Sequence, residues 1–230
     1  MALPDNGRPG PKTPVTIKVF RYKPGQIDPP RYDTFTVDAD PRMTVLDALE
    51  DIRTSQDSTL LYRHSCHHGS CGTCAMKVNG VEILSCVTNV LDQGKTLVVE
   101  PLSVLPLIAD LVVDMTYFAH FFAPMGMRLL RKSEFQPQAQ PPEGIPAFTR
   151  YEQCLECAMC ISACPIVNTD SSFIGPAALG AASRAVQKGD RSIRDIAQIV
   201  DWEHGLWRCH EIMECSAACP NDVDPGGLLM

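Results

Sequence analysis

Residues 154–165 read Cys-Leu-Glu-Cys-Ala-Met-Cys-Ile-Ser-Ala-Cys-Pro, and residues 209–220 read Cys-His-Glu-Ile-Met-Glu-Cys-Ser-Ala-Ala-Cys-Pro. The two stretches share one spacing of cysteines and a closing proline, but Ile212 stands in the second where Cys157 stands in the first. Cysteines clustered this closely are typical of metal ligands in a reducing compartment. The sequence therefore contains an internal repeat from which one metal ligand has been deleted.

The first of these runs has the spacing of bacterial ferredoxins that hold two iron–sulfur clusters. In such proteins the fourth cysteine of each run binds the cluster of the other run. Applied here, the rule predicts a [4Fe–4S] cluster on Cys154, Cys157, Cys160 and Cys219. It leaves three ligands for a second cluster, namely Cys164, Cys209 and Cys215. The absent ligand at Ile212 predicts that this cluster is [3Fe–4S], with a [4Fe–4S] cluster bound by a non-cysteine fourth ligand as the alternative.

A separate group of cysteines lies earlier in the chain. Its members, which have the spacing of a plant-type [2Fe–2S] ferredoxin loop, are Cys66, Cys71, Cys74 and Cys86. Gly69 and Gly72 would permit the positive φ angles that bring backbone N–H groups to the sulfurs. Arg63 would add positive potential. We therefore predict a [2Fe–2S] cluster on this loop.

Two other kinds of metal site could use the same loop. A Rieske centre needs two histidines on one iron, and Cys74 stands where the second histidine should fall. A structural zinc site usually takes paired Cys-x2-Cys knuckles, of which only one is present. We predict that His64, His67 and His68 lie on the loop surface or beside the cluster without binding iron.

The cysteine count and the overall charge narrow the function. The three ligand sets use all eleven cysteines, and the odd number argues against a disulfide framework. A formal net charge of −7 argues against nucleic acid as the main partner. The sequence shows no phosphate-binding glycine loop and no catalytic motif. These features predict an electron carrier without catalytic residues of its own.

The pattern of apolar residues divides the chain into three parts. Residues 14–105 alternate as short strands around one helix near 44–52, which predicts a small β-rich domain. Residues 106–144 predict a connecting helix, starting near Ile108, and a Pro/Gln-rich linker. Residues 145–230 lack alternation and predict an α-helical domain, with one helix opening at Gly175 and another around Ile193.

Together these features resemble the iron–sulfur subunits of succinate dehydrogenases and fumarate reductases. The resemblance covers nearly the whole chain from about Thr16 and includes the isoleucine at position 212. Stretches that support it lie at residues 44–49, 65–76, 110–115 and 173–177. It implies an α+β chain, with an N-terminal β-grasp domain like plant-type [2Fe–2S] ferredoxins and a C-terminal all-α domain like bacterial ferredoxins.

The resemblance also implies an electron relay with named partners. A flavoprotein subunit with covalently attached FAD would oxidise succinate, and electrons would pass through the [2Fe–2S], [4Fe–4S] and [3Fe–4S] clusters to a quinone. Membrane-anchor subunits, with haem b left open, would hold the chain at the cytoplasmic face of a bacterial plasma membrane. By position, Pro165, His210 and Ile212 flank the three-iron cluster and would face the quinone.

One departure and several alternatives accompany this interpretation. Residues 166–170 lack the tryptophans that many family members carry after the equivalent of Pro165, which favours menaquinone. Fumarate reduction stays open because a relay conducts in both directions. A relay subunit of another dehydrogenase or of a heterodisulfide-type reductase, and a zinc-stabilised binding module without redox function, are the remaining alternatives.

Overall fold

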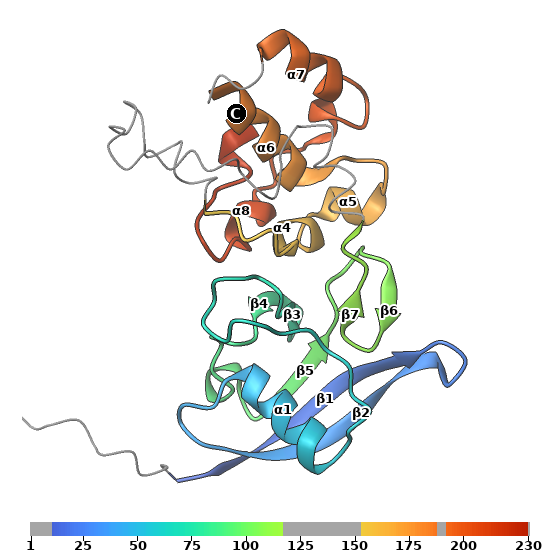
Figure 1. The fold of residues 1–230 in the computed structure, drawn as a ribbon, viewed down its shortest axis with the longest axis vertical. Helices are drawn as coiled ribbons and strands as arrows, with labels where there is room; N and C mark the ends of the chain where they lie inside the picture. The colour runs from blue at the N-terminus through green and yellow to red at the C-terminus, as the bar shows by residue number, and fades with distance from the viewer. Residues whose placement is uncertain (1–10, 117–152, 188–191, 230) are drawn as a thin grey trace, which may run out of the picture. The chain divides into compact units, whose positions relative to one another are not determined.

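The structure is a computed structural model that describes residues 11–116, 153–187 and 192–229. The chain divides into two compact units (Figure 1). Of the described residues, the first unit comprises those up to Pro101 together with Leu107–Val113, and the second comprises Leu102–Pro106 together with those from Asp114 onward. The chain therefore enters the second unit, returns to the first, and then leaves it again.

The first unit is built on a five-stranded mixed sheet. Its strands are β1 (Thr13–Lys23), β2 (Ile27–Ala39), β3 (Ala75–Val78), β4 (Val81–Leu84) and β5 (Thr96–Glu100), in the order β2-β1-β5-β3-β4. Strand β1 pairs antiparallel with β2 and parallel with β5, while β3 pairs antiparallel with β4 and β5. A short 3-10 turn, η1 (Leu91–Gln93), precedes β5. The sheet confirms the β-grasp prediction.

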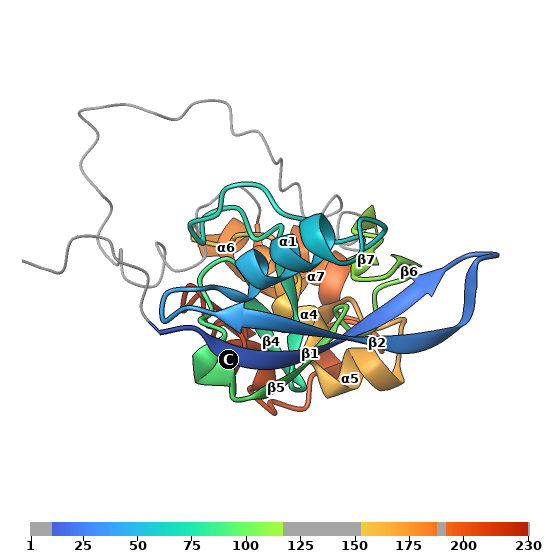
Figure 2. The ribbon, with the colours of Figure 1, turned by 90° about the horizontal axis from the view of Figure 1, so that it is seen from below.

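Helix α1 (Val45–Ser55) lies on one face of this sheet (Figure 2). It begins where predicted because Thr44 caps it. The Thr44 hydroxyl accepts the N–H of Asp47, and the Asp47 carboxylate accepts the N–H of Thr44. Leu46 and Leu49 on its inner side are buried with the alternate residues of β1, which gives the first unit an apolar core.

The predicted helix from Ile108 is wrong over its first residues. Strands β6 (Leu107–Ala109) and β7 (Val112–Val113) form an antiparallel hairpin instead. Asp110 lies at its turn with a φ of 45°, and its carboxylate accepts backbone N–H groups from two distant segments. These bonds stabilise a turn in place of a helix. The rest of the predicted helix and the linker, residues 117–144, lie outside the described residues.

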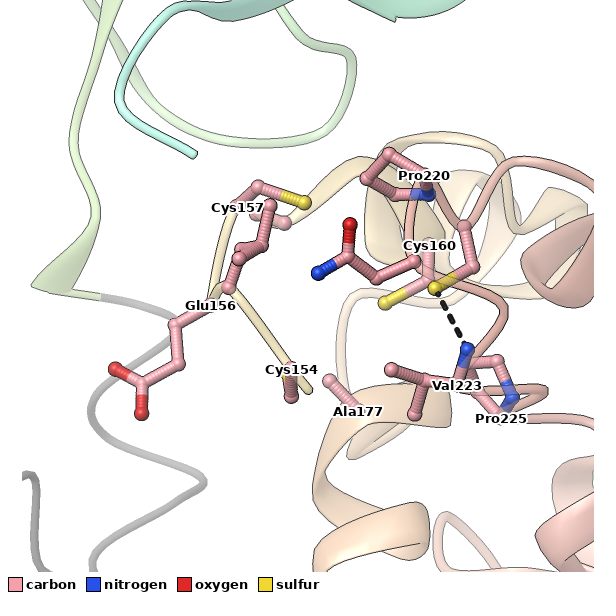
Figure 3. Close-up of a pocket in the computed structure, with 12 residues that line it drawn as sticks. Cys154, Glu156, Cys157, Cys160, Ala177, Pro220, Val223 and Pro225 are labelled. Atoms are coloured by element: carbon pink, nitrogen blue, oxygen red, sulfur yellow. Dashed lines mark hydrogen bonds between the residues drawn. The ribbon is translucent and has the colours of Figure 1, made fainter. Parts of the chain in front are cut away.

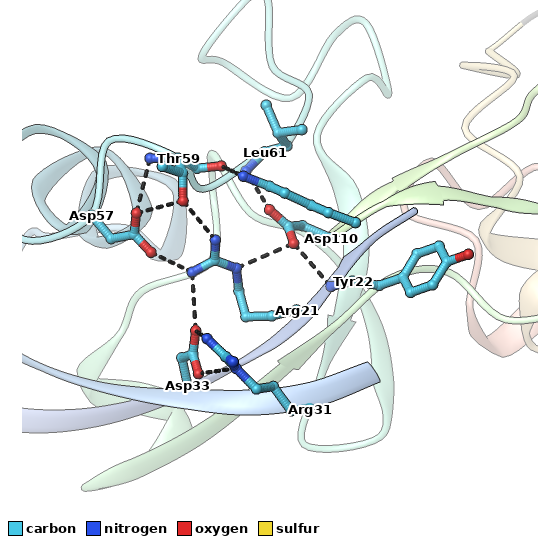
Figure 4. A network of polar contacts seen from close by, with 9 residues as sticks. Arg21, Tyr22, Arg31, Asp33, Asp57, Thr59, Leu61 and Asp110 are labelled. Atoms are coloured by element: carbon cyan, nitrogen blue, oxygen red, sulfur yellow. Dashed lines mark hydrogen bonds and ion pairs between the residues drawn. The ribbon is translucent and has the colours of Figure 1, made fainter. Parts of the chain in front are cut away.

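A buried ion network centred on Arg21 ties this hairpin to the sheet (Figure 4). The Arg21 side chain is 1% exposed, and its Nε lies 3.1 Å from Oδ1 of the fully buried Asp110. Its other nitrogens donate to Asp33, Asp57 and Thr59. One guanidinium on β1 therefore joins β2, the segment after α1 and the β6–β7 hairpin.

We expect Asp57→Asn to lower the free energy of unfolding by about 1–2 kcal/mol at pH 7. Hydrogen bonds from the Thr59 hydroxyl and the Arg21 guanidinium hold the pKa of the Asp57 carboxyl well below its usual range. The Asp57 carboxyl therefore binds a proton more tightly in the unfolded chain than in the folded chain. The stabilisation is fully present above the unfolded-state pKa of about 4 and is lost as the pH falls through the folded-state pKa.

Urea denaturation of both full-length proteins between about pH 3.5 and pH 7 measures this effect. The difference in unfolding free energy should be constant above about pH 5 and should shrink below about pH 4, because only the unfolded chain then takes up a proton at Asp57. A difference that stays constant down to about pH 3.5 would show that the Asp57 pKa is not depressed.

The second unit is helical over the residues that the structure describes. Its helices are α4 (Met159–Ser162), α5 (Pro165–Thr169), α6 (Gly175–Gln187), α7 (Ile193–Val200) and α8 (Glu214–Ala217), with 3-10 turns η3 (Leu206–Arg208) and η4 (Gly227–Leu229). The predicted helices at Gly175 and Ile193 are confirmed. Small buried residues of α6, such as Ala178 and Ala181, permit close packing of its neighbours. Within the described ranges, no helix has the length and apolar content needed to cross a bilayer.

The short segment Leu102–Pro106 packs within the second unit, although it follows the last strand of the large sheet. Its Ser103 N–H donates to the Ser162 hydroxyl at 2.8 Å. Leu102 and Leu105 on either side of this bond are buried. The segment therefore belongs to the core beside helix α4.

Candidate metal centres

Four cysteine thiols converge at one end of the β3–β4 hairpin. Cys66, Cys71 and Cys74 lie on the loop between α1 and β3, and Cys86 follows β4. The Cys66 thiol interacts with Cys71, and the Cys86 thiol interacts with Cys74. Because Ala75 pairs with Leu84, the hairpin brings the flanking cysteines to the same end. The structure thus gathers the four residues predicted to hold a [2Fe–2S] cluster.

Backbone N–H groups point at these sulfurs. The N–H groups of His68 and Ser70 lie 3.5 and 3.3 Å from Cys66 Sγ, and that of Gly69 lies 3.3 Å from Cys86 Sγ. Such hydrogen bonds, the one from His68 foremost, lower the pKa of the Cys66 thiol to about 6. Burial raises the pKa of Cys86 to about 11. The loop is therefore built to offset the negative charge of thiolate ligands.

Left-handed backbone at two glycines makes this arrangement of N–H groups attainable. The φ angle is 76° at Gly69 and 70° at Gly72, as predicted. A Cβ atom at Gly69 would lie 3.3 Å from the Val87 side chain. Any larger residue at position 69 would therefore be strained in its backbone and crowded by its neighbour.

The three loop histidines contact one another or the backbone. His64 Nδ1 lies 2.9 Å from His67 Nε2. His68 Nδ1 lies 2.5 Å from the carbonyl oxygen of Cys66. His64 and His67 therefore contact each other, whereas the His68 ring contacts the backbone of Cys66.

Arg63 makes a contact that the sequence did not predict. The sequence favoured a contribution of positive potential to the cysteine loop. In the structure its Nη2 donates to the Val113 carbonyl oxygen at 3.0 Å. Arg63 therefore fastens strand β7 to the segment that leads into the loop.

In the second unit, cysteines from both runs line one apolar pocket (Figure 3). Its cysteines are Cys154, Cys157, Cys160 and Cys219. Cys219 reaches the pocket from the C-terminal run, and the Val223 N–H donates to its Sγ at 3.3 Å. Ala177 of α6 contributes to the apolar wall. These are the four residues predicted to hold the [4Fe–4S] cluster.

A second pocket collects the remaining cysteines. Its lining includes Cys164, Cys209 and Cys215, together with Pro165, His210 and Ile212. The Ile212 side chain is 48% exposed and occupies the position that corresponds to Cys157 in the first run. The structure thus separates seven cysteines into sets of four and three that cross between the runs.

The two runs share a backbone conformation as well as a spacing. Glu156 and Glu211 have φ angles of 55° and 53°, and Ala158 and Met213 have φ angles of 65° and 66°. Ala158 and Met213 each precede a one-turn helix, α4 in the first run and α8 in the second. Residues other than glycine seldom adopt this conformation, so its recurrence at matching positions indicates a shared constraint. The sequence repeat is also a structural repeat.

The chemistry of these thiols fits metal clusters. Burial raises the pKa of Cys154 to about 12, and it also raises the pKa of Cys160, Cys164 and Cys215. Neighbouring sulfurs add to these shifts, Cys157 for Cys154 and Cys164 for Cys215. Several thiolates in an apolar pocket require positive charge among them, which iron would supply.

A polar cluster at the end of α5 was missed by the sequence analysis. Asp170 Oδ2 lies 2.9 Å from His204 Nδ1 and 2.9 Å from Arg208 Nε. The hydrogen bond with His204 is the largest cause of a lowered pKa at Asp170. Arg208 directly precedes Cys209, so the cluster helps to fix the start of the second run. No local pattern signals it, because Asp170 and His204 are 34 residues apart.

Comparison with known families matches both units. A family described as a 2Fe-2S iron-sulfur cluster binding domain matches residues 16–120. A second, described as a 4Fe-4S dicluster domain, matches residues 150–223. The chain therefore has an N-terminal 2Fe-2S sheet domain and a C-terminal helical dicluster domain.

Similarity to known proteins extends over almost the whole chain. The fumarate reductase iron-sulfur subunit of Mycobacterium tuberculosis is 34% identical over 94% of this chain and 90% of its own length. The mitochondrial succinate dehydrogenase iron-sulfur subunit 2 of Oryza sativa is 32% identical over 96% of this chain and 74% of its own length. A solved chain of the Mycobacterium smegmatis Sdh1 complex in the apo form has the same fold, with a TM-score of 0.79 and 21% identity over 94% of this chain and 91% of that chain. The chain belongs to the family of iron–sulfur electron-transfer subunits of succinate dehydrogenases and fumarate reductases.

Proposed function

We propose that this chain is the electron-transfer subunit of a membrane-bound succinate dehydrogenase that reduces a quinone. The observation that carries the proposal is the division of seven cysteines between two pockets, with Ile212 beside the set of three. Together with the quartet of residues 66–86, this division supports one [2Fe–2S], one [4Fe–4S] and one [3Fe–4S] cluster. When bound, these clusters supply the one-electron chemistry that amino-acid side chains lack.

The chain's own residues hold these groups and set their surroundings. Backbone N–H groups donate to the sulfurs of Cys66, Cys86 and Cys219, which favours additional negative charge at those positions. The walls of the two pockets in the second unit are mainly apolar. Differences in hydrogen bonding and solvent exposure let three sites on one chain have different reduction potentials. Substrate oxidation is assigned to a separate flavoprotein subunit that carries FAD.

We place the quinone end of the relay at the second pocket. Pro165, His210 and Ile212 line it, and the last two are exposed to solvent in this chain. Membrane-anchor subunits at the cytoplasmic face of a bacterial plasma membrane would cover this surface. Residues 166–170 contain no tryptophan, which favours menaquinone as the acceptor.

We expect Ile212→Cys to convert the three-iron cluster into a four-iron cluster. A thiol at position 212 restores the ligand that the second run lacks, and Ile212 already lines the pocket that holds the other three cysteines. The low-temperature EPR signal of the oxidised three-iron cluster should disappear. The iron content should rise from about nine to about ten per chain.

Ile212→Val is the matched control, because valine keeps the pocket apolar and supplies no ligand. It should retain the three-iron signal. If Ile212→Cys also retains that signal at full intensity, the assignment of the second pocket to a [3Fe–4S] cluster is wrong.

Fumarate reduction is the second candidate function. The relatives from Mycobacterium tuberculosis and Escherichia coli, which are 34% and 32% identical to this chain, are both named as fumarate reductase subunits. The relay residues serve either direction, because direction follows from the potentials of the clusters and of the quinone.

Purification of the complex through an affinity tag on this chain tests both proposals. A co-purifying flavoprotein with covalent FAD and quinone-dependent succinate oxidation would support the first. Redox titration of the three clusters and the bound quinone, with rates measured in both directions, would identify the second if fumarate reduction is faster. A complex without a flavoprotein, or a chain with far fewer than about nine irons, would contradict both.

A further inference from the structure

Glu50, His64 and His67 bring three metal-ligand atoms together outside the cysteine sets. His64 Nδ1 lies 3.6 Å from Glu50 Oε1 and 2.9 Å from His67 Nε2. One ligand atom from each residue lies within 4.8 Å of the other two. Glu50 belongs to helix α1, whereas both histidines belong to the loop that carries the first cysteine quartet. The three side chains therefore join two separate segments of the first unit.

We propose that these three side chains bind a divalent transition-metal cation such as Zn²⁺, separately from the iron–sulfur clusters. Two imidazoles and one carboxylate form a ligand set that suits Zn²⁺ and leaves the fourth position for water. Bonds of about 2.0–2.1 Å place the ligand atoms of a tetrahedral zinc ion about 3.4 Å apart. The distances of 2.9 and 3.6 Å lie on either side of that value, so small side-chain movements suffice.

The surrounding packing orients the ligands in advance. The His64 ring lies 5.4 Å from the ring of buried Tyr62, which in turn lies 5.7 Å below the Arg53 guanidinium. The His67 ring meets His64 edge to face at 5.0 Å, and its backbone holds a left-handed φ of 62°. Glu50 extends from helix α1, which holds its backbone in place, and its side chain is 39% exposed. Preorganised ligands lose little conformational freedom on binding, which favours affinity.

Metal binding would replace the hydrogen bond between the two histidines. One of the two facing nitrogens carries a proton in that bond, whereas metal binding needs a free electron pair on each. The proton moves to the other nitrogen of the same imidazole by a change of tautomer. No electron is transferred, and both histidines remain neutral.

An ion at this position would act on the neighbouring cysteine loop. His67 directly follows Cys66, so a divalent cation adds positive charge next to a predicted cluster ligand. That charge favours the reduced state of the [2Fe–2S] cluster and therefore raises the reduction potential of the cluster. This effect rests on the proposed function in one respect, because it requires the [2Fe–2S] cluster to be present. The ion would also cross-link the loop to α1 and stabilise the first unit.

Anaerobic calorimetric titration of the cluster-loaded, full-length chain with Zn²⁺ tests the proposal. We expect His64→Gln and His67→Gln each to weaken Zn²⁺ binding by more than about 100-fold, and Glu50→Gln by about 10-fold. His68→Gln is the matched control, because the His68 ring faces the Cys66 carbonyl oxygen and should not contribute. Iron content is measured after each titration, so that replacement of iron by zinc is detected.

A second readout locates the bound ion. Ni²⁺ is paramagnetic, so at this site it should enhance the relaxation of the reduced [2Fe–2S] EPR signal, and His67→Gln should abolish that enhancement. A wild-type dissociation constant weaker than about 1 mM, or equal Zn²⁺ affinity in wild type and His64→Gln, overturns the proposal. If the cluster signals themselves are absent, the proposed function fails, whereas the calorimetric comparison still decides the zinc site.

Discussion

Cys219→Ala is expected to remove the four-iron cluster and to spare the three-iron cluster, although Cys219 belongs to the C-terminal run. The reason is that Cys219 lines the pocket of Cys154, Cys157 and Cys160. Loss of one thiolate from that set should lower the iron content from about nine to about five per chain. Iron analysis and low-temperature EPR of the purified complex measure the change, and the oxidised three-iron signal should remain.

Cys164→Ala is the mirror experiment and the control. It removes a cysteine of the N-terminal run, yet Cys164 lines the pocket of Cys209 and Cys215. The three-iron signal should vanish and about six irons should remain. If Cys219→Ala instead loses the three-iron cluster, or Cys164→Ala loses the four-iron cluster, the crossed ligation is wrong. General unfolding would instead remove the signals of both pockets in both variants.

Arg21→Met is expected to lower the free energy of unfolding by about 3–5 kcal/mol. Methionine fills much of the same space but leaves Asp110 as a fully buried carboxylate without its cation. It also removes the donor that Asp57 and Asp33 share. Urea denaturation of the full-length chain, followed through the visible circular dichroism of the [2Fe–2S] cluster, would report the loss in the first unit.

Arg31→Met provides the matched control for this change. Arg31 also pairs with Asp33, at 2.9 Å, but its side chain is 60% exposed. Solvent screens such a pair, so the control should change stability by no more than about 1 kcal/mol. If both variants lose equal stability, the buried network does not have the role assigned to it.

Local patterns in the sequence sufficed for the elements whose stabilising contacts are also local. Helix α1 could be predicted because Thr44 and Asp47 cap it and because Leu46 and Leu49 share one side. The strands of the sheet followed from alternation. The grouping of the cysteines in the second unit followed from a spacing rule and agrees with the two pockets of the structure.

Features that depend on distant partners were not predictable in the same way. Ile108, Leu111 and Met115 fit a helical period, but the Asp110 carboxylate bonds to Leu61 and Tyr22, which are 49 and 88 positions away. Those long-range bonds favour a hairpin. The cluster of Glu50, His64 and His67 was missed for a related reason, because one member lies on a helix and the others on a loop.

The alternation of the chain between units at residues 102–113 has a consequence for dissecting the protein. A fragment ended at residue 105, where the strand pattern places the first boundary, would lack Asp110, the fully buried carboxylate that pairs with Arg21. It would also retain Ser103, whose bonding partner Ser162 lies in the piece cut away. An N-terminal fragment designed to fold on its own must therefore extend through Val113. Its residues Leu102–Pro106, which pack in the second unit, are best replaced by a neutral spacer.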